Sequence, residues 1–233
     1  AKPLVGKGRL SLQVTGRGGV PGGSVSAVVL NVTAVNPTST GYLTVYPDGG
    51  ARPVVSNLNF TRNTIVPNLV IVPVSSDGKV AFFNGQSGTI DLLADVAGYF
   101  VSGTPTLAGA FAPVAPNRIL DTRARNGVAT TTPVAPKGTV TLQVTGRGGV
   151  PVSGVSSVVL NVTTVLPTSS GFATVYPDGS ARPVVSNLNF VTGLTIANLV
   201  VVPVGPDGKV KLFNGSAGKT HLLADVAGYF LAG

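Results

Sequence analysis

One long internal duplication constrains the fold of this chain more than any other feature. Residues 11–103 align with residues 141–233 at a constant shift of 130 positions and without a gap. Identical phrases mark the alignment: LQVTGRGGVP at 12–21 and 142–151, ARPVVSNLNF at 51–60 and 181–190, and LLADVAGYF at 92–100 and 222–230. Because each copy repeats a whole succession of apolar runs and turns, we expect two modules of one architecture.

Apolar and polar residues alternate within each copy. In TVTLQVT (139–145), Val140, Leu142 and Val144 share one face, while Gln143 and the threonines share the other, which is typical of a half-buried strand. Further strands are expected in the first copy at 27–35, 41–47, 55–60, 68–74, 79–84 and 92–100. The segment 61–66, which differs between the copies, is expected to be a loop that leads into a strand. No segment carries a helical apolar stripe, so the sequence predicts an all-β protein.

Seven or eight short strands in each copy, separated by turns such as PDGG and SDGK, predict two tandem antiparallel β-sandwich modules. A second architecture also fits. RILDTR, VVLNVT and ANLVVV each begin a block of similar length in the second copy, as in a pseudo-threefold β-trefoil or β-prism. We expect one module at 1–103, a linker at 104–117 and the second module at 118–233.

The two copies differ most where they begin. The second copy is preceded by RILDTR (118–123), which we expect to be a strand, and the first copy has no equivalent. Either the first copy lost this strand, or the strand lies upstream of this sequence, or 118–123 pairs with the first copy. A sheet that lacks one strand exposes backbone groups to which another chain can add itself.

Composition narrows the classes of partner. The chain has no Cys, no Met and no Glu, and its 16 Lys and Arg against 8 Asp give a net charge of +8. These cations form no run, so we expect no nucleic-acid partner, and acidic cell-wall polymers or polysaccharides fit better. No apolar run is long enough to span a membrane. The absence of Met at position 1 indicates a processed or excised piece, and a mature secreted chain would have lost its signal peptide.

The sequence offers little material for catalysis. His221 is the only histidine, and its counterpart in the first copy is Asp91, so we expect a histidine at a strand end rather than a catalytic base. Asp95 and Asp225 lie in the apolar strand LLADVAGYF, where backbone N–H groups or an arginine are expected to satisfy them. Without Cys or a calcium-loop pattern, we expect no metal site and no cofactor.

Repeated polar and aromatic residues near turns are the candidate ligand contacts. An aromatic face can stack on a sugar ring while Asp, Asn and Arg hold its hydroxyl groups. The candidates are Tyr46, Asp48, Arg52, Asn57 and Asn59 in the first copy, and Tyr176, Asp178, Arg182, Asn187 and Asn189 in the second. Ordinary hairpin structure is the competing explanation for the same residues.

The succession RILDTR, LQVTGRGGVP, VVLNVT, GFATVYPDG, RPVVSNLNF, ANLVVVPVGPDGKV, LFNG and HLLADVAGYF resembles an accessory module common in secreted proteins of Streptomyces and other actinobacteria. Such modules occur in tandem or beside cell-wall hydrolases. The resemblance covers 111–233, and 11–103 without the first strand, and it implies an extracellular, non-catalytic surface module. Related modules often have Cys in corresponding strands, and this chain has none.

We consider two main functions and one less supported class. The first is a lectin-like or adhesin-like module that binds glycan or the cell wall, with two linked sites acting together. The second is a structural repeat subunit of a secreted fibre, stalk or particle, assembled by strand addition with copies of itself or with a neighbouring β module. A hydrolase is the third and least supported class, because no catalytic set is apparent.

Overall fold

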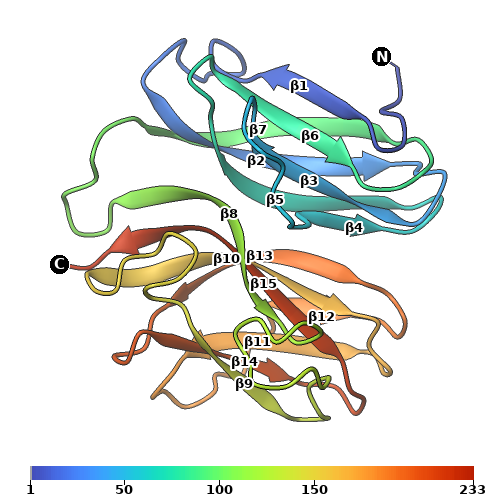
Figure 1. Cartoon of the computed structure of the whole chain (residues 1–233), viewed down its shortest axis with the longest axis vertical. Coiled ribbons are helices and arrows are strands. Elements are labelled where there is room, and N and C mark those ends of the chain that lie inside the picture. Colours follow the sequence, from blue (N-terminus) through green and yellow to red (C-terminus); the bar gives the residue numbers. More distant parts are fainter. Residues whose placement is uncertain (1) are drawn as a thin grey trace. The chain divides into compact units, whose positions relative to one another are not determined.

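The computed structural model describes residues 2–233 as β-strands joined by turns, and it contains no helix within that range (Figure 1). None of these residues therefore belongs to a helix that could cross a membrane. The chain divides after Thr104 into two compact units, which we call unit 1 and unit 2. Each unit consists of two antiparallel sheets, so the prediction of tandem all-β sandwich modules is confirmed and the threefold alternative is wrong.

Unit 1 contains seven strands. One sheet, the β3 sheet, has the order β1-β6-β3-β4 and consists of β1 (Arg9–Gln13), β6 (Lys79–Asn84), β3 (Gly41–Pro47) and β4 (Leu58–Phe60). The other, the β2 sheet, has the order β5-β2-β7 and consists of β5 (Ile65–Pro73), β2 (Val25–Val35) and β7 (Asp91–Val101). β7 therefore lies at one end of its sheet.

Unit 2 repeats this plan and adds one strand. Its β11 sheet has the order β12-β11-β14-β9, formed by β12 (Leu188–Phe190), β11 (Gly171–Pro177), β14 (Lys209–Asn214) and β9 (Thr139–Gln143). Its β10 sheet has the order β13-β10-β15-β8, formed by β13 (Ile196–Pro203), β10 (Val155–Val165), β15 (His221–Leu231) and β8 (Phe111–Asp121). β8 has no counterpart in unit 1.

Alternating side chains seal each unit. In unit 1, Val28 and Leu30 from β2 pack in one core with Val45 from β3 and Phe82 from β6, and all four are buried. The residues between them on the β3 sheet face outward, because successive side chains of a strand point to opposite sides. Each fully buried Val, Leu or Phe contributes about 1.5–3 kcal/mol to stability.

Glycines close the hairpins at the expected positions. Gly49 and Gly78 have φ angles of 77° and 79°, and Gly179 and Gly208 have 82° and 78°. Only glycine adopts this left-handed backbone at little cost, so the Asp-Gly pairs specify the turns.

β8 differs from the expected strand at 118–123. It begins at Phe111, so residues 111–117, which were expected to form part of a linker, are extended as well. β8 pairs antiparallel with β15 of its own unit (Figure 1). The register of this pair shifts between Ala224 and Asp225 and between Val226 and Gly228. Pro113 and Pro116 are tolerated because β8 is an edge strand whose other side needs no donor.

Candidate functional site

The repeated phrase ARPVVSNLNF forms a flap that folds back onto the outer face of the sheet. In unit 1 the hydroxyl of Thr44 donates to the Val55 carbonyl at 2.7 Å, and the Asn57 backbone N–H donates to the Leu43 carbonyl at 2.9 Å. The Arg52 guanidinium lies over the Phe83 ring, 4.2 Å from its centroid. This cation–π contact fixes the exposed start of the flap against β6.

Unit 2 builds the same flap with the same contacts. Thr174 donates to the Val185 carbonyl at 2.6 Å, and the Arg182 guanidinium lies 4.2 Å from the centroid of the Phe213 ring. The two identical phrases thus form the same anchoring contacts, although Val55 is 4% exposed and Val185 is 50% exposed.

Asn57 and Asn187 hold the flap from beneath. The side-chain oxygen of Asn57 accepts a hydrogen bond from the Val45 backbone N–H at 2.7 Å, and Asn68 donates from its side chain to the Asn57 carbonyl at 2.6 Å. Asn187 accepts from the Val175 N–H at 2.7 Å in the same way. Both candidate asparagines therefore satisfy backbone groups of the sheet.

Four further candidates lie in the flaps or close to them without forming an open site. Tyr46 and Tyr176 are on the outer faces of their sheets but are buried, at 4% and 7% exposure. The Asn59 amide nitrogen is buried and has no partner among residues 2–233. Asn189 is exposed, and its side-chain oxygen accepts a hydrogen bond from the Ser186 hydroxyl at 2.9 Å.

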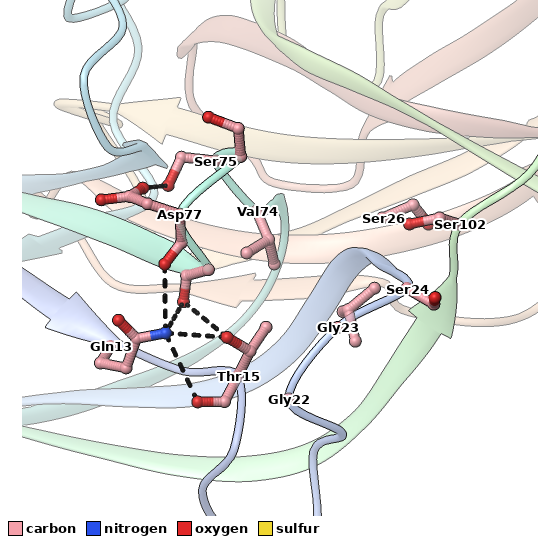
Figure 2. A pocket seen from close by; sticks show the side chains of 13 residues that line it. Gln13, Thr15, Gly22, Gly23, Ser24, Ser26, Val74, Ser75, Asp77 and Ser102 are labelled. Carbon is pink, nitrogen blue, oxygen red and sulfur yellow. Dashed lines mark hydrogen bonds between the residues drawn. The ribbon is translucent and has the colours of Figure 1, made fainter.

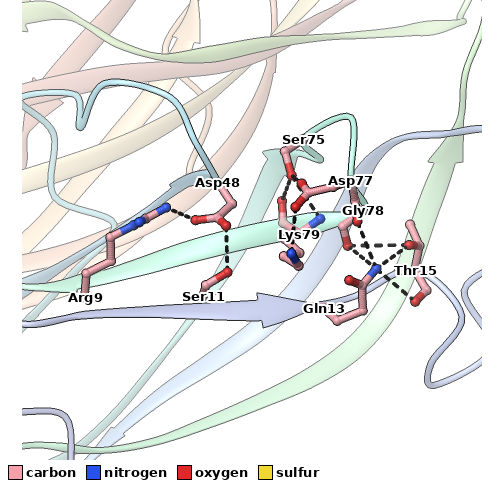
Figure 3. Close-up of polar contacts among 9 residues, drawn as sticks. All are labelled: Arg9, Ser11, Gln13, Thr15, Asp48, Ser75, Asp77, Gly78 and Lys79. Carbon is pink, nitrogen blue, oxygen red and sulfur yellow. Dashed lines mark hydrogen bonds and ion pairs between the residues drawn. The ribbon is translucent and has the colours of Figure 1, made fainter.

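Asp48 lies in the turn that precedes the flap of unit 1, and its side chain contacts β1. Its carboxylate pairs with Arg9 and accepts a hydrogen bond from the Ser11 hydroxyl at 2.6 Å (Figure 3). Arg9 lies opposite Phe83 in the sheet, and the Arg52 guanidinium from the flap lies over the Phe83 ring.

Asp178 is neutralised from a different strand. Lys211 of β14 pairs with it at 2.6 Å, whereas the position of Arg9 is taken by Thr139 in unit 2. The hydrogen bond from Lys211, together with one from the Gly179 N–H, lowers the pKa of the Asp178 carboxyl. We call the set Asp48, Arg52 and Phe83, and its repeat Asp178, Arg182 and Phe213, the arginine clusters.

A polar hollow lies beside the end of β1 in unit 1. It has a volume of about 490 Å³ and is lined mainly by hydroxyl, amide and backbone groups, with a carboxylate at Asp77 (Figure 2). Its lining includes Gln13, Thr15, Ser24, Ser26, Ser75 and Ser102. No aromatic ring lines it among the described residues.

Gln13 ties the floor of this hollow together. Its amide nitrogen donates to the Thr15 hydroxyl at 2.8 Å, the Asp77 carbonyl at 3.2 Å and the Gly78 carbonyl at 3.0 Å (Figure 3). Lys79 and Ser75 hydrogen bond to the Asp77 carboxylate, and these bonds lower the pKa of that carboxyl. Gln143 repeats the arrangement with Thr145 and Gly208.

Asp225 shows how a carboxylate is accommodated in an apolar strand. Arg118 of β8 grips it with two hydrogen bonds, of 2.7 Å from Nε and 3.0 Å from Nη2. The expectation of an arginine at this position is confirmed for Asp225. Asp95, its counterpart in unit 1, is exposed and has no ion pair within residues 2–233.

A further group of charged residues of unit 2 lies at the end of β8. Burial raises the pKa of the Asp121 carboxyl, but hydrogen bonds from the Arg123 guanidinium and backbone N–H outweigh burial, so that pKa is lowered. His221 begins β15, and its Nδ1 lies 2.9 Å from the Thr122 hydroxyl. Burial, and then the nearby Arg123 charge, lower the pKa of this imidazole.

Sequence reasoning missed the partners of the candidate residues. Phe83 and Phe213 occupy equivalent positions in the two copies, and this repetition was the available signal. Arg9 and Lys211 carried no such signal, because each is present in one copy alone. Among residues 2–233 no three His, Cys, Asp or Glu side chains lie together as metal ligands do.

No known family model matches this sequence, and no curated protein matches it either. Among solved structures the chain is similar to the cycloalternan-forming enzyme from Listeria monocytogenes in complex with a pentasaccharide substrate, with 16% identity and a TM-score of 0.29. The match covers 97% of this chain and spans 22% of that enzyme. A likeness this distant carries no argument about function.

Proposed function

We propose that the chain is a non-catalytic extracellular module pair that binds glycan or a cell-wall polymer through the arginine clusters. The observation that carries the proposal is the repetition of one exposed arrangement in both units: an arginine stacked on a phenylalanine beside a carboxylate held by a cation. A stacked guanidinium keeps donors free at its edge, and these suit sugar hydroxyls or acidic groups.

Charge supports an acidic or polyhydroxylated ligand. The net charge of +8 raises the local concentration of anionic polymers around the protein. Six of the eight carboxylates are paired with Lys or Arg, which leaves the excess cations available on the surface. Two weak sites on one chain gain affinity for a polymer through effective concentration.

The pairing of carboxylates also favours binding over catalysis. Asp48, Asp121, Asp178 and Asp225 are each held by a guanidinium or ammonium group rather than by a second acid or a base. For Asp121 and Asp178 this pairing lowers the pKa of the carboxyl, which disfavours a role as general acid near neutral pH.

The test compares retention of three proteins on purified cell wall and on a glycan array. The double variant Arg52→Ala/Arg182→Ala removes one guanidinium from each unit. The matched control Arg62→Ala/Lys219→Ala removes the same charge from other exposed positions. The proposal predicts that the first variant loses at least tenfold in affinity, about 1.4 kcal/mol or more, while the control stays within about threefold. Equal losses in the two double variants would show that binding depends on net charge alone and not on the arginine clusters. If the parent protein is not retained at all, the proposal is refuted.

A further inference from the structure

The most informative difference between the two units is the missing neighbour of β7. In unit 2, β15 lies between β10 and β8, and in unit 1 the equivalent strand β7 pairs with β2 alone. β7 runs over eleven residues, from Asp91 to Val101, and within residues 2–233 it pairs with β2 as the last strand of its sheet. Such an edge is a template for another strand.

Side chains along β7 are exposed where their counterparts are buried. Val96 is 37% exposed, whereas Val226 is fully buried in the core of unit 2, where it packs in one cluster with Ile119 of β8. Asp95 is exposed, whereas Asp225 is 2% exposed beneath the Arg118 guanidinium. These differences arise at the positions that β8 contacts in unit 2.

Unit 1 has a groove at the position that the Ile119 side chain occupies in unit 2. It has a volume of about 450 Å³ and lies between β1, β2, β7 and the loop that contains Arg17 and Gly18. Its lining includes Leu12, Leu30, Asp95 and Val96. In unit 2 a Cβ on Gly148, the counterpart of Gly18, would lie 2.8 Å from Ile119 Cγ2. A Cβ on Gly18 would meet Val96 alone, 3.2 Å away. Ile119 therefore fills in unit 2 the space that is open in unit 1.

We propose that β7 accepts a β-strand from outside residues 1–233, with an arginine paired to Asp95 and the following aliphatic residue seated in this groove. Unit 2 defines the chemistry of the occupant: an extended segment with the Arg-Ile-Leu-Asp order of residues 118–121. Backbone hydrogen bonds along β7 give affinity, and the arginine and the aliphatic side chain select the partner. This site is separate from the arginine clusters and does not depend on them.

Two occupants from this chain itself fit less well. A second β7 brings Asp91 and Asp95 but no cation, so two β7 edges side by side would place only negative charges together. The β8 strand of a second copy is already held in its own unit by the Arg118–Asp225 pair, and moving it would break both hydrogen bonds to that buried carboxylate.

The register of the added strand can be tested by cross-linking, because the chain has no cysteine. Tyr229 lies opposite Ala112 in unit 2, and Tyr99 is the counterpart of Tyr229. We expect the full chain with Tyr99→Cys to form a disulfide with a synthetic peptide of residues 111–123 that carries Ala112→Cys. Directly opposite residues bring Cα atoms to about 4.5–5.5 Å, within disulfide range. A peptide with Pro116→Cys should react at least tenfold more slowly.

Affinity for the unmodified peptide tests the ion pair. We expect Asp95→Asn to weaken binding by about tenfold, and Asp95→Arg to abolish it. A peptide with Arg118→Asp should restore binding to the Asp95→Arg chain. Asp91→Asn is the matched control, because it removes the same charge from the start of the same strand, and it should change affinity by less than about twofold.

Hydrogen exchange of the full chain locates the bound peptide. Protection of amides in β7 supports the proposal. Protection confined to β15, which would show exchange with β8, overturns it, as does equal cross-linking of the two cysteine peptides. Light scattering of the chain alone tests whether β7 binds a second copy. Dimers that disappear with Asp95→Arg would assign the β7 edge to a second copy and would refute the proposal.

Discussion

Replacing Arg118 by methionine tests whether β8 is held by its ion pair or by its apolar side chains. The two hydrogen bonds to Asp225 are short, and the side chains are 16% and 3% exposed, so the pair is largely removed from water. Methionine preserves the bulk of the arginine stem but removes both guanidinium hydrogen bonds from the buried Asp225 carboxylate. Removing one partner of such a pair costs about 3–5 kcal/mol.

The opposite truncation should cost less. Asp225→Asn leaves Arg118 with Asp121, whose carboxylate is 3.6 Å away, and with partial contact to solvent. The double variant Arg118→Met/Asp225→Leu removes both charges, and we expect it to recover most of the stability lost by Arg118→Met alone.

Urea unfolding followed by hydrogen exchange measures these effects, because amides in β10 and β15 report on unit 2 apart from unit 1. Amides of β2 serve as the internal reference and should not change. A loss below about 1 kcal/mol for Arg118→Met, or a double variant no more stable than the single one, would refute the reasoning that Asp225 is electrostatically buried.

Three other outcomes are expected. Gly78→Ala should cost more than the about 1–2 kcal/mol of a left-handed alanine, because its Cβ would lie 1.9 Å from the Thr15 hydroxyl oxygen, and Gly49→Ala, with nothing within 4 Å, should cost only that amount; thermal unfolding compares them. Asn57→Ala should cost about 1–3 kcal/mol by leaving the buried Val45 N–H unpaired, and a loss smaller than that of the less buried Asn187→Ala would contradict this account. Because the pKa of His221 is lowered in the folded state, the unfolded chain binds the extra proton, so stability should fall as the pH drops through about 6.5 and level off below the folded pKa; His221→Asn should remove this component from unfolding measured between pH 8 and 5.

The sequence contained enough information to predict the layers of the fold. Alternation in segments such as 79–84 and the Asp-Gly turns specify strands and hairpins locally, and β3, β6 and β7 lie within a residue of their expected bounds. The segment 61–66 was correctly expected to lead from a loop into a strand, because β5 begins at Ile65.

Contacts between distant segments could not be predicted in this way. Arg118 and Asp225 are 107 residues apart, and no local pattern indicates that they meet. The start of β8 was missed because Pro113 and Pro116 are typical of a linker, and only the edge position of the strand makes them acceptable. The ligand-contact residues stay a prediction, although Asn57, Asn187 and the tyrosines have structural contacts or burial that explain their repetition.

The antiparallel pairing of β8 with β15 determines how unit 2 would respond to mechanical tension. Phe111 lies opposite Phe230, and the Gly109 N–H donates to the Leu231 carbonyl at 3.0 Å, so the polypeptide enters and leaves this unit at the same end of one strand pair. A pull on the two ends would load these hydrogen bonds one after another, as in opening a zip, rather than all at once. Unit 2 should therefore open at low force.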